Sequence, residues 1–594
     1  MEIPPGPKYV LQLLPFFLLP SVIAFGLIRF SAVYLVVIVP NWLAILSIIL
    51  ARPLLIIFQC YYARHVDKNA AAVHNAFIIP HIEEKRPAFA GLSIIRTLVN
   101  DFKTGYPGDR LLQWKEKYGN VFQLRLPSDN WIVTFEPDHV KSILVTQFDS
   151  FDKGEIMFSQ FVSLLGTGVF NSDGDMWKFH QTMTRPFFTR ERITDFDNFD
   201  MHMYRALDLA KHRLAEGHAI DFQDLVSHFT FDSGTQFLFG HDVESLSAGL
   251  PYSPCSEIPN SAEFVNHPSN VFVNAFLEGQ SITAFRTRMG PNWPLSEFWS
   301  DKVKSLRKIM DGFMEPLMIE ALKNTAATEK ADLGGTDESS GTLLSHLVKH
   351  TQDVSVLKDE LINLLVAGRD TTASLLSYAF YMLTQYPNIA QRLHQEVLDK
   401  IGATKRPTYD DIRDTKYLRA FLNEVLRLYP PVPFDSRSSC KETVWTSKTP
   451  GSKPYYIPNN TRILYSIFHM HRRTDLWGPD ALEFDPDRFL DERLHKYLTP
   501  NPYIFCPFNA GPRICLGQQF AYQESSFFLI RLLQQFTNFR MVPEAQPEEF
   551  KPPASWKDCG NRKALEKICP GIHLTMYIKG GLWVRMDELR AGPN

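Results

Sequence analysis

The sequence has few cysteines and no surplus of either charge. Seven cysteines, an odd number, are scattered along 594 residues without a Cys-x-x-Cys spacing. This usage suits a reducing compartment and gives neither a disulfide framework nor a zinc-binding pattern. The formal net charge of −3 shows no basic excess, and we expect no nucleic-acid partner. No internal repeat and no flavin or nicotinamide motif is apparent.

Long uncharged runs, in contrast, are concentrated at the N-terminus. Residues 10–28 and 31–51 are each long enough to cross a bilayer. We therefore predict a membrane anchor over residues 1–65. Two spans would form a hairpin around Arg29, whereas the prolines within both runs are nearly as compatible with one span plus an interfacial segment. A soluble pair of apolar helices is the remaining alternative.

Basic residues follow the second run, at Arg52, Arg64, His65 and Lys68. By the positive-inside tendency, they place the bulk of the chain in the cytosol. Residues 66–104 read as a connector, and residues 105–594 as one large domain. That domain is mainly helical with small β-sheets. Hairpins are predicted at residues 120–135 and around Gly580-Gly581.

One cysteine stands in a loop punctuated by glycine and proline. Residues 508–517 read Phe-Asn-Ala-Gly-Pro-Arg-Ile-Cys-Leu-Gly, and residues 518–535 have the apolar pattern of a buried helix. Cys515 thus lies at a helix start, where the helix dipole and free N–H groups would stabilise a thiolate. A lone thiolate beside one cation suggests haem rather than zinc. The alternative is an inert cysteine in a turn.

The pattern Phe-x-x-Gly-x-Arg-x-Cys-x-Gly resembles the signature of the cytochrome P-450 family. The resemblance implies that Cys515 is the axial ligand of the iron in haem b, iron protoporphyrin IX. Arg513 would pair with a haem propionate, and Phe508 would shield the sulfur. Gly511 and Gly517 would let the backbone approach the cofactor closely.

Residues 354–385 predict a long buried helix that is interrupted by a polar stretch, Ala367-Gly368-Arg369-Asp370-Thr371-Thr372. The Thr371 hydroxyl can bond to the Ala367 carbonyl and open the helix locally. Gly368 would leave room for dioxygen, and Thr371 with Asp370 would relay protons. The stretch resembles the family's oxygen-activation motif. A helix kink with a solvated aspartate is the alternative.

Residues 151–177 resemble the family's loop and helix over the haem edge, where Trp177 would donate its indole N–H to a propionate. An arginine is usual four residues later, but this chain has Gln181. A neutral amide supplies no charge, so propionate neutralisation would rest on Arg513 and Arg437, or on His180.

Glu424 and Arg427 lie three residues apart on one helix face, and Arg488 follows downstream in a Phe-Asp-Pro-Asp-Arg-Phe stretch. Such pairs are usually solvated. The resemblance instead implies that the three form a buried brace beneath the cysteine loop, with a structural role.

The resemblance covers residues 105–586 and implies a cytochrome P-450 fold behind the membrane anchor. It further implies a monooxygenase that takes electrons from a separate NADPH-cytochrome P-450 reductase, with cytochrome b5 as a further partner. The sequence of residues 229–246 resembles the fungal alkane and fatty-acid hydroxylase branch. We therefore expect apolar substrates dissolved in membrane lipid, and an endoplasmic reticulum location with the catalytic domain facing the cytosol.

Two other functions compete with hydroxylation. One is a haem-thiolate enzyme of the same fold that rearranges or dehydrates hydroperoxides, and such members usually alter the oxygen-side threonine, which this chain keeps at Thr371. The other is a non-enzymatic haem-binding sensor or carrier on the membrane.

Overall fold

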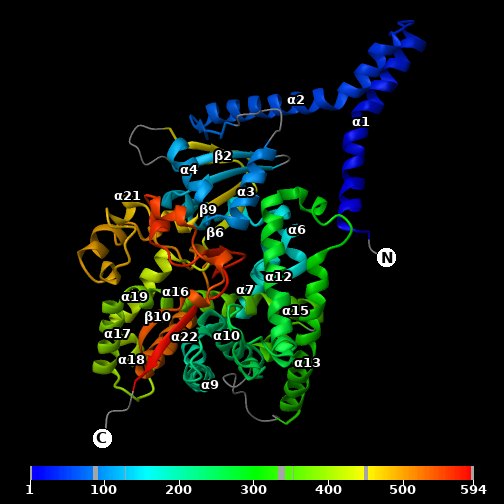
Figure 1. Cartoon of the computed structure of the whole chain (residues 1–594). Coiled ribbons are helices and arrows are strands. Elements are labelled where there is room, and N and C mark those ends of the chain that lie inside the picture. Colours follow the sequence, from blue (N-terminus) through cyan, green and yellow to red (C-terminus); the bar gives the residue numbers. More distant parts are fainter. Residues whose placement is uncertain are drawn as a thin grey trace.

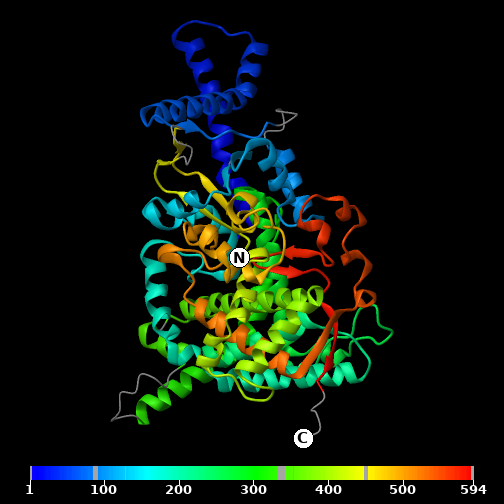
Figure 2. The same cartoon turned by 90° about the vertical axis from the view of Figure 1, so that its left-hand side faces the viewer.

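The computed structural model describes residues 3–83, 91–126, 129–331, 342–351, 353–446 and 453–589. In Figure 1, a helical hairpin projects from a body that has a β-rich part beside the hairpin and a larger helical part below it. The view turned by a quarter in Figure 2 shows the same stacking. The mainly helical fold with small sheets is confirmed.

Helices α1 (Pro5–Tyr34) and α2 (Asn41–Val73) form the projecting hairpin. Both are long and apolar enough to cross a membrane. The predicted turn at Arg29 is wrong, because α1 continues past it and the chain reverses over residues 35–40. Pro40 is the N-cap of the second helix and disfavours helical backbone in the residue before it.

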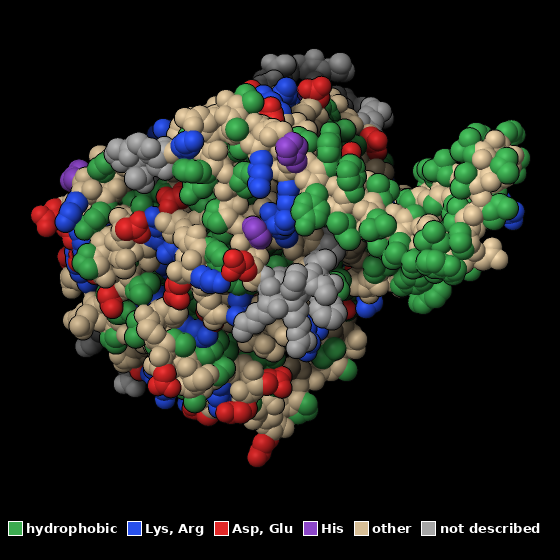
Figure 3. Space-filling view, turned by 90° about the horizontal axis from the view of Figure 1, so that it is seen from above, with side chains coloured by type: hydrophobic (Ala, Val, Ile, Leu, Met, Phe, Trp, Pro, Cys, Tyr) green, Lys and Arg blue, Asp and Glu red, His purple; other side chains and the backbone are tan. Residues whose placement is uncertain are grey.

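The hairpin is held together by only a few polar contacts. The Ser21 hydroxyl donates to the Ile48 carbonyl over 2.8 Å, and the Arg52 guanidinium lies 3.4 Å from the centre of the Phe16 ring. The later part of α2 turns away from α1 and crosses above the β-rich part (Figure 1), and the helix contains Pro53. Figure 3 shows the projecting hairpin covered by hydrophobic side chains.

The β-rich part is built on a five-stranded sheet of order β2-β3-β9-β6-β4. Strands β2 (Val121–Leu126) and β3 (Asp129–Thr134) pair antiparallel, as the first predicted hairpin requires. Strand β9 (Arg462–Ser466) runs parallel to β3 and antiparallel to β6 (Phe434–Ser439), and β4 (Phe151–Asp152) forms the edge. The sheet thereby brings residues 121–152 beside residues 434–466.

The second predicted hairpin is wrong. Strand β12 (Met576–Ile578) pairs with β11 (Pro570–Ile572), whereas β13 (Trp583–Glu588) pairs with β10 (Phe536–Met541) and β5 (Ile220–Asp221). The Asp221 carboxylate accepts the Leu582 N–H over 2.8 Å and draws the chain onto β5. Local turn residues therefore did not decide the pairing.

The predicted helix at residues 354–385 is α15 (Val354–Leu365), a π-helical turn at Val366–Asp370, and α16 (Thr371–Gln385). The Asp353 side chain caps its start, and Pro387 opens the next helix. Helix α16 packs among α10 (Phe222–Phe239), α19 (Lys416–Leu428) and α22 (Gln518–Gln535) in the largest hydrophobic cluster. The polar break thus lies inside the molecule.

The other helices are α3 (Leu92–Thr104), α4 (Asp109–Tyr118), α5 (Pro137–Lys141), α6 (Gly154–Leu165), α7 (Gly174–Thr184), α8 (Arg190–Ile193), α9 (Phe196–Ala215), α11 (Ala262–Val265), α12 (Pro268–Met289), α13 (Lys302–Ala331), α14 (Leu343–His350), α17 (Pro387–Lys400), α18 (Tyr409–Asp414), α20 (Ile467–Met470) and α21 (Thr474–Trp477). The other strands are β1 (Phe77–Ile78), β7 (Thr443–Trp445) and β8 (Tyr455–Ile457).

Candidate active site

A cavity of about 530 Å³ brings the cysteine loop and the broken helix to one space. Among the described residues, its wall includes every predicted cofactor-binding and catalytic residue except Gly511 and Asp370. These wall residues are Trp177, Ala367, Gly368, Thr371, Arg437, Phe508, Arg513, Cys515 and Gly517. Segments more than 300 residues apart in the chain thus meet at this cavity.

The cysteine loop is shaped by backbone contacts. The Cys515 N–H donates to the Phe508 carbonyl over 3.0 Å. Gly511 has a φ of 67°, and a Cβ there would lie 1.9 Å from the Leu144 carbonyl oxygen. Gly511 is thus required by the neighbouring backbone, and its approach to the cofactor stays a prediction.

Cys515 is exposed toward the cavity, but desolvation by the surrounding protein raises the pKa of its thiol to about 11, and the Gly517 N–H only partly opposes this shift. The expectation that the loop alone keeps the sulfur anionic is therefore wrong. Helix α22 begins only at Gln518, so its dipole acts from beyond the cysteine. A cation at the sulfur would favour the thiolate, and a haem iron held by Cys515 would supply that charge.

Arg513 lies at the edge of the cavity beside Trp177. Its guanidinium donates to the Asp173 carboxylate over 2.7 Å and to the Ser172 carbonyl over 3.1 Å, and it stacks 4.4 Å from the Trp177 ring centre. Desolvation lowers the pKa of Arg513 to about 10, so it stays charged at neutral pH. A cation beside an indole N–H suits a carboxylate ligand such as a propionate.

Arg437, on β6, is held by a network that the sequence did not reveal. Its Nη1 donates to Asp435 over 2.9 Å, and the Lys153 Nζ donates to the same carboxylate over 3.2 Å. The two cations hold the pKa of Asp435 well below its usual range. Lys153 also lines the cavity. It lies in the Phe-Asp-Lys-Gly stretch at residues 151–154, but nothing local to it indicated a contact with Asp435.

Gln181, the departure from the family pattern, lines the cavity and donates from Nε2 to the Pro512 carbonyl over 2.7 Å. It therefore ties α7 to the cysteine loop. His180 points elsewhere: it is fully buried, donates to the Thr167 carbonyl over 2.8 Å and lies 2.9 Å from the Glu360 carboxylate. The suggestion that His180 neutralises a propionate is wrong.

The long helix of residues 354–385 is interrupted at the polar stretch where the sequence predicted a local opening. At the π-helical turn, the Thr371 hydroxyl donates to the Ala367 carbonyl. A Cβ built on Gly368 would meet nothing within 4 Å, apart from its own helix turn. Turns of this kind interrupt the backbone ladder and often mark functional sites. Thr371 and Gly368 thus border an open part of the cavity.

Asp370 is turned away from that space. Its carboxylate accepts hydrogen bonds from Arg369 Nη1 and Gln280 Nε2, each over 2.5 Å, and it is buried. The structure therefore brings Thr371, but not the Asp370 carboxylate, to the cavity. A relay that uses both groups requires the Asp370 side chain to exchange partners.

The residues predicted as a brace come together. Arg427 forms two hydrogen bonds of 2.7 Å to the Glu424 carboxylate, and the Arg488 Nε lies 3.6 Å from the same carboxylate. Their side chains are 0 to 1% exposed. Arg427 also donates to three carbonyls, those of His471, Ala481 and Glu483. The brace therefore ties α19 to the segment at residues 471–488.

His471 connects this brace to the cysteine loop. Its Nδ1–H donates to the Arg427 carbonyl over 3.1 Å, and its Nε2 accepts the Cys506 N–H over 3.1 Å. These two hydrogen bonds fit only the neutral tautomer that carries its proton on Nδ1. Burial and the nearby charge of Arg427 lower the pKa of His471 from 6.5 to about 3.

We expect His471 to make the protein less stable in acid. The unfolded chain binds the proton below about pH 6.5 and the native state does not, so stability falls as pH drops from 6.5 toward 3. The loss between pH 7 and pH 5 is about 2 kcal/mol. Urea unfolding at both pH values should show a shallower loss in His471→Gln. His212→Gln, at an exposed histidine on α9, is the control, and an equal effect there would contradict the assignment.

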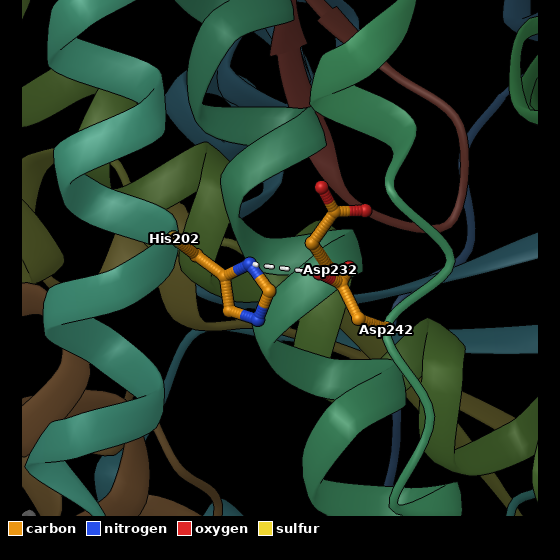
Figure 4. Close-up of side chains that lie close together, drawn as sticks. All are labelled: His202, Asp232 and Asp242. Carbon is orange, nitrogen blue, oxygen red and sulfur yellow. Dashed lines mark ion pairs between the residues drawn. The ribbon is translucent and has the colours of Figure 1, made fainter.

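A second cluster of ionisable side chains, His202, Asp232 and Asp242, lies between α9 and α10 (Figure 4). Asp232 accepts the N–H groups of Ser245 and Leu246 over 2.7 and 3.0 Å, and Asp242 pairs with Arg205 over 2.5 Å. Because both carboxylates have protein partners, we interpret the cluster as a clamp on the loop after α10.

A cavity wall that combines one cysteine, an interrupted buried helix and several cations is the arrangement expected of a haem-thiolate monooxygenase. The sequence matches the cytochrome P450 family over residues 93–560, and the chain belongs to that family. Haem is the family's cofactor, and its members draw electrons from a reductase.

Individual relatives agree with this assignment. The chain is 32% identical to cytochrome P450 52E1 of Candida apicola, over 81% of this chain and 88% of the relative. It is also 32% identical to cytochrome P450 52A13 of Debaryomyces hansenii, over 87% and 93%. The cytochrome P450 monooxygenase pvhE of Talaromyces variabilis is 35% identical, over 70% and 75%.

Proposed function

We propose that this monooxygenase hydroxylates alkanes or fatty acids taken from a membrane. The observation that carries the proposal is the mainly hydrocarbon wall of the Cys515 cavity. Aromatic and aliphatic side chains from several helices contribute to it, including Phe161, Leu165, Phe237, Leu238, Leu364 and Leu375. Such a wall favours apolar chains by burying them from water, at about 25 cal/mol per Å².

The residues of the cavity fit haem. Cys515 would hold the iron, and Arg513, Trp177 and Arg437 would bind the propionates. When bound, haem supplies the reductive activation of dioxygen. The protein's part is to hold the Thr371 hydroxyl at the open turn, to leave space at Gly368, and to exclude water with hydrocarbon walls.

The exposed α1–α2 hairpin supports a site on the endoplasmic reticulum membrane with the catalytic domain in the cytosol. Basic side chains at its base, Arg64 and Lys68, favour that orientation. In this setting NADPH-cytochrome P-450 reductase supplies electrons, and cytochrome b5 is a second donor. A membrane location also gives apolar substrates a short path to the enzyme.

The substrate class is tested by titrating the haem-loaded protein with alkanes, fatty acids and polycyclic aromatic compounds. We expect the first two to displace the Soret absorption and to yield hydroxylated product with reductase and NADPH. A response to polycyclic compounds alone would contradict the proposal. Binding of alkanes and fatty acids without turnover would favour a carrier.

We expect Thr371→Ala to separate NADPH consumption from product formation. Without the hydroxyl that bonds to Ala367, proton delivery at the open turn is impaired. Product per NADPH should fall about tenfold or more while NADPH oxidation continues. Thr371→Ser keeps the hydroxyl and should restore most of the yield. An unchanged yield in Thr371→Ala would contradict a proton-delivery role.

A further inference from the structure

The positively charged side chains along the cavity wall differ in whether a carboxylate lies beside them. Five of them lie within 4.0 Å of a carboxylate: Arg110, Lys153, Arg437, Arg462 and Arg513. Arg288 and Lys579 also line the cavity, but neither has a carboxylate within ion-pair distance among the described residues. The positive charge of these two side chains therefore has no counter-charge from the part of the protein described.

Arg288 lies near the end of α12, which packs against α3. Its Nη1 donates to the Ala284 carbonyl over 2.6 Å and to the Thr287 hydroxyl over 2.9 Å. Its guanidinium carbon lies 4.4 Å from the centre of the Phe102 ring. These neutral partners orient the guanidinium and leave its charge uncompensated.

Keeping that charge at a hydrocarbon wall is costly. Desolvation lowers the pKa of Arg288 to about 10, so the side chain remains a cation at neutral pH. A partly buried cation without a counter-ion destabilises the protein unless a ligand supplies the missing charge. A carboxylate is well matched, because it accepts two parallel hydrogen bonds from a guanidinium.

We propose that Arg288 binds the carboxylate of a fatty acid, so that the anionic fatty acid rather than the alkane is the preferred substrate. This rests on the proposed function and deepens it. The alkyl chain would lie along the apolar wall of the cavity that Arg288 shares with Cys515. The C–H bonds offered for oxidation would then belong to the chain and not to the headgroup. Arg288 is a specificity residue.

The first measurement needs no variant. Hexadecanoic acid, its methyl ester and hexadecane differ at one end only, and we expect the acid to bind the haem-loaded protein at least about tenfold more tightly than the ester. The readout is the displacement of the Soret band. Equal affinities of acid and ester would overturn the proposal.

The second measurement compares variants that retain the thiolate-haem absorption with carbon monoxide. In Arg288→Gln, the ratio of kcat/KM for the acid to kcat/KM for hexadecane should fall at least about tenfold, mainly through KM. Arg288→Lys should restore part of it. Arg110→Gln is the matched control, since Arg110 lines the same cavity but has the Asp101 carboxylate at 4.0 Å, and it should change the ratio less than about threefold.

The outcomes distinguish an error in the role of Arg288 from an error in the proposed substrate class. If acid and alkane both bind and the ratio is unchanged in Arg288→Gln, the role of Arg288 is wrong and the proposed function stands. An equal loss with both substrates would assign Arg288 a structural role and also overturn the inference. If neither substrate displaces the Soret band of the wild-type protein, the proposed substrate class fails, and the inference fails with it.

Discussion

Replacing Cys515 with alanine should abolish both the thiolate-type spectrum and turnover. The cavity wall offers one thiol, that of Cys515, among the described residues. Without iron ligation by sulfur, the reduced protein with carbon monoxide should lose the red-displaced Soret band that a thiolate-bound ferrous haem gives. Hydroxylation with reductase and NADPH should fall to the background of the assay. The fold should persist, because the alanine occupies the same loop without added volume.

Cys506 provides the control for this result. It lies nine positions earlier, before the same loop, is buried, and donates its S–H to the Tyr503 carbonyl over 3.3 Å. Cys506→Ala should cost about 1 kcal/mol of stability through the small cavity it leaves, and should keep the spectrum. A red-displaced band that survives in Cys515→Ala, or that disappears in a folded Cys506→Ala, would refute the assignment of Cys515 as the iron ligand.

Features with short sequence patterns could be predicted from the sequence. Cys515 and Thr371 each lie in a short sequence pattern that resembles a family motif, and the structure brings both to one cavity. The β2–β3 hairpin was predictable for the same reason, since alternating strands flank a turn.

Features that depend on distant segments were not predictable. The pairing of β13 with β5 joins residues far apart in the chain, and it overrode the local hairpin signal of Gly580-Gly581. The contact of Lys153 with Asp435 also joins residues far apart in the chain, and so does the contact of Asp370 with Gln280. The missing counter-charge of Arg288 can be recognised only once the neighbours of every cation are known.

Breaking the buried brace should produce the largest loss of stability. Arg427→Leu leaves the Glu424 carboxylate fully buried, with the Arg488 Nε at 3.6 Å and the Asp485 N–H at 2.9 Å as its neighbours. It also removes the donor to three buried or partly buried carbonyls. Removing one partner of a buried ion pair typically costs 3–5 kcal/mol, so we expect a loss of about 3–5 kcal/mol in urea unfolding of the full-length protein.

The cost should depend on which charge is left behind. In Glu424→Leu/Arg427→Leu no unpaired carboxylate remains, so the double variant should lose clearly less stability than the sum of the losses in the two single variants.

Asp410 and Arg413 form the matched control, because they are also three residues apart on a helix, but their side chains are 62 to 63% exposed. Arg413→Leu should therefore cost no more than about 0.5 kcal/mol. Similar losses in Arg427→Leu and Arg413→Leu would show that the brace contributes nothing beyond a surface pair. Additive losses in the double variant would show that Glu424 and Arg427 act independently, and that the carbonyl contacts of Arg427 carry its effect.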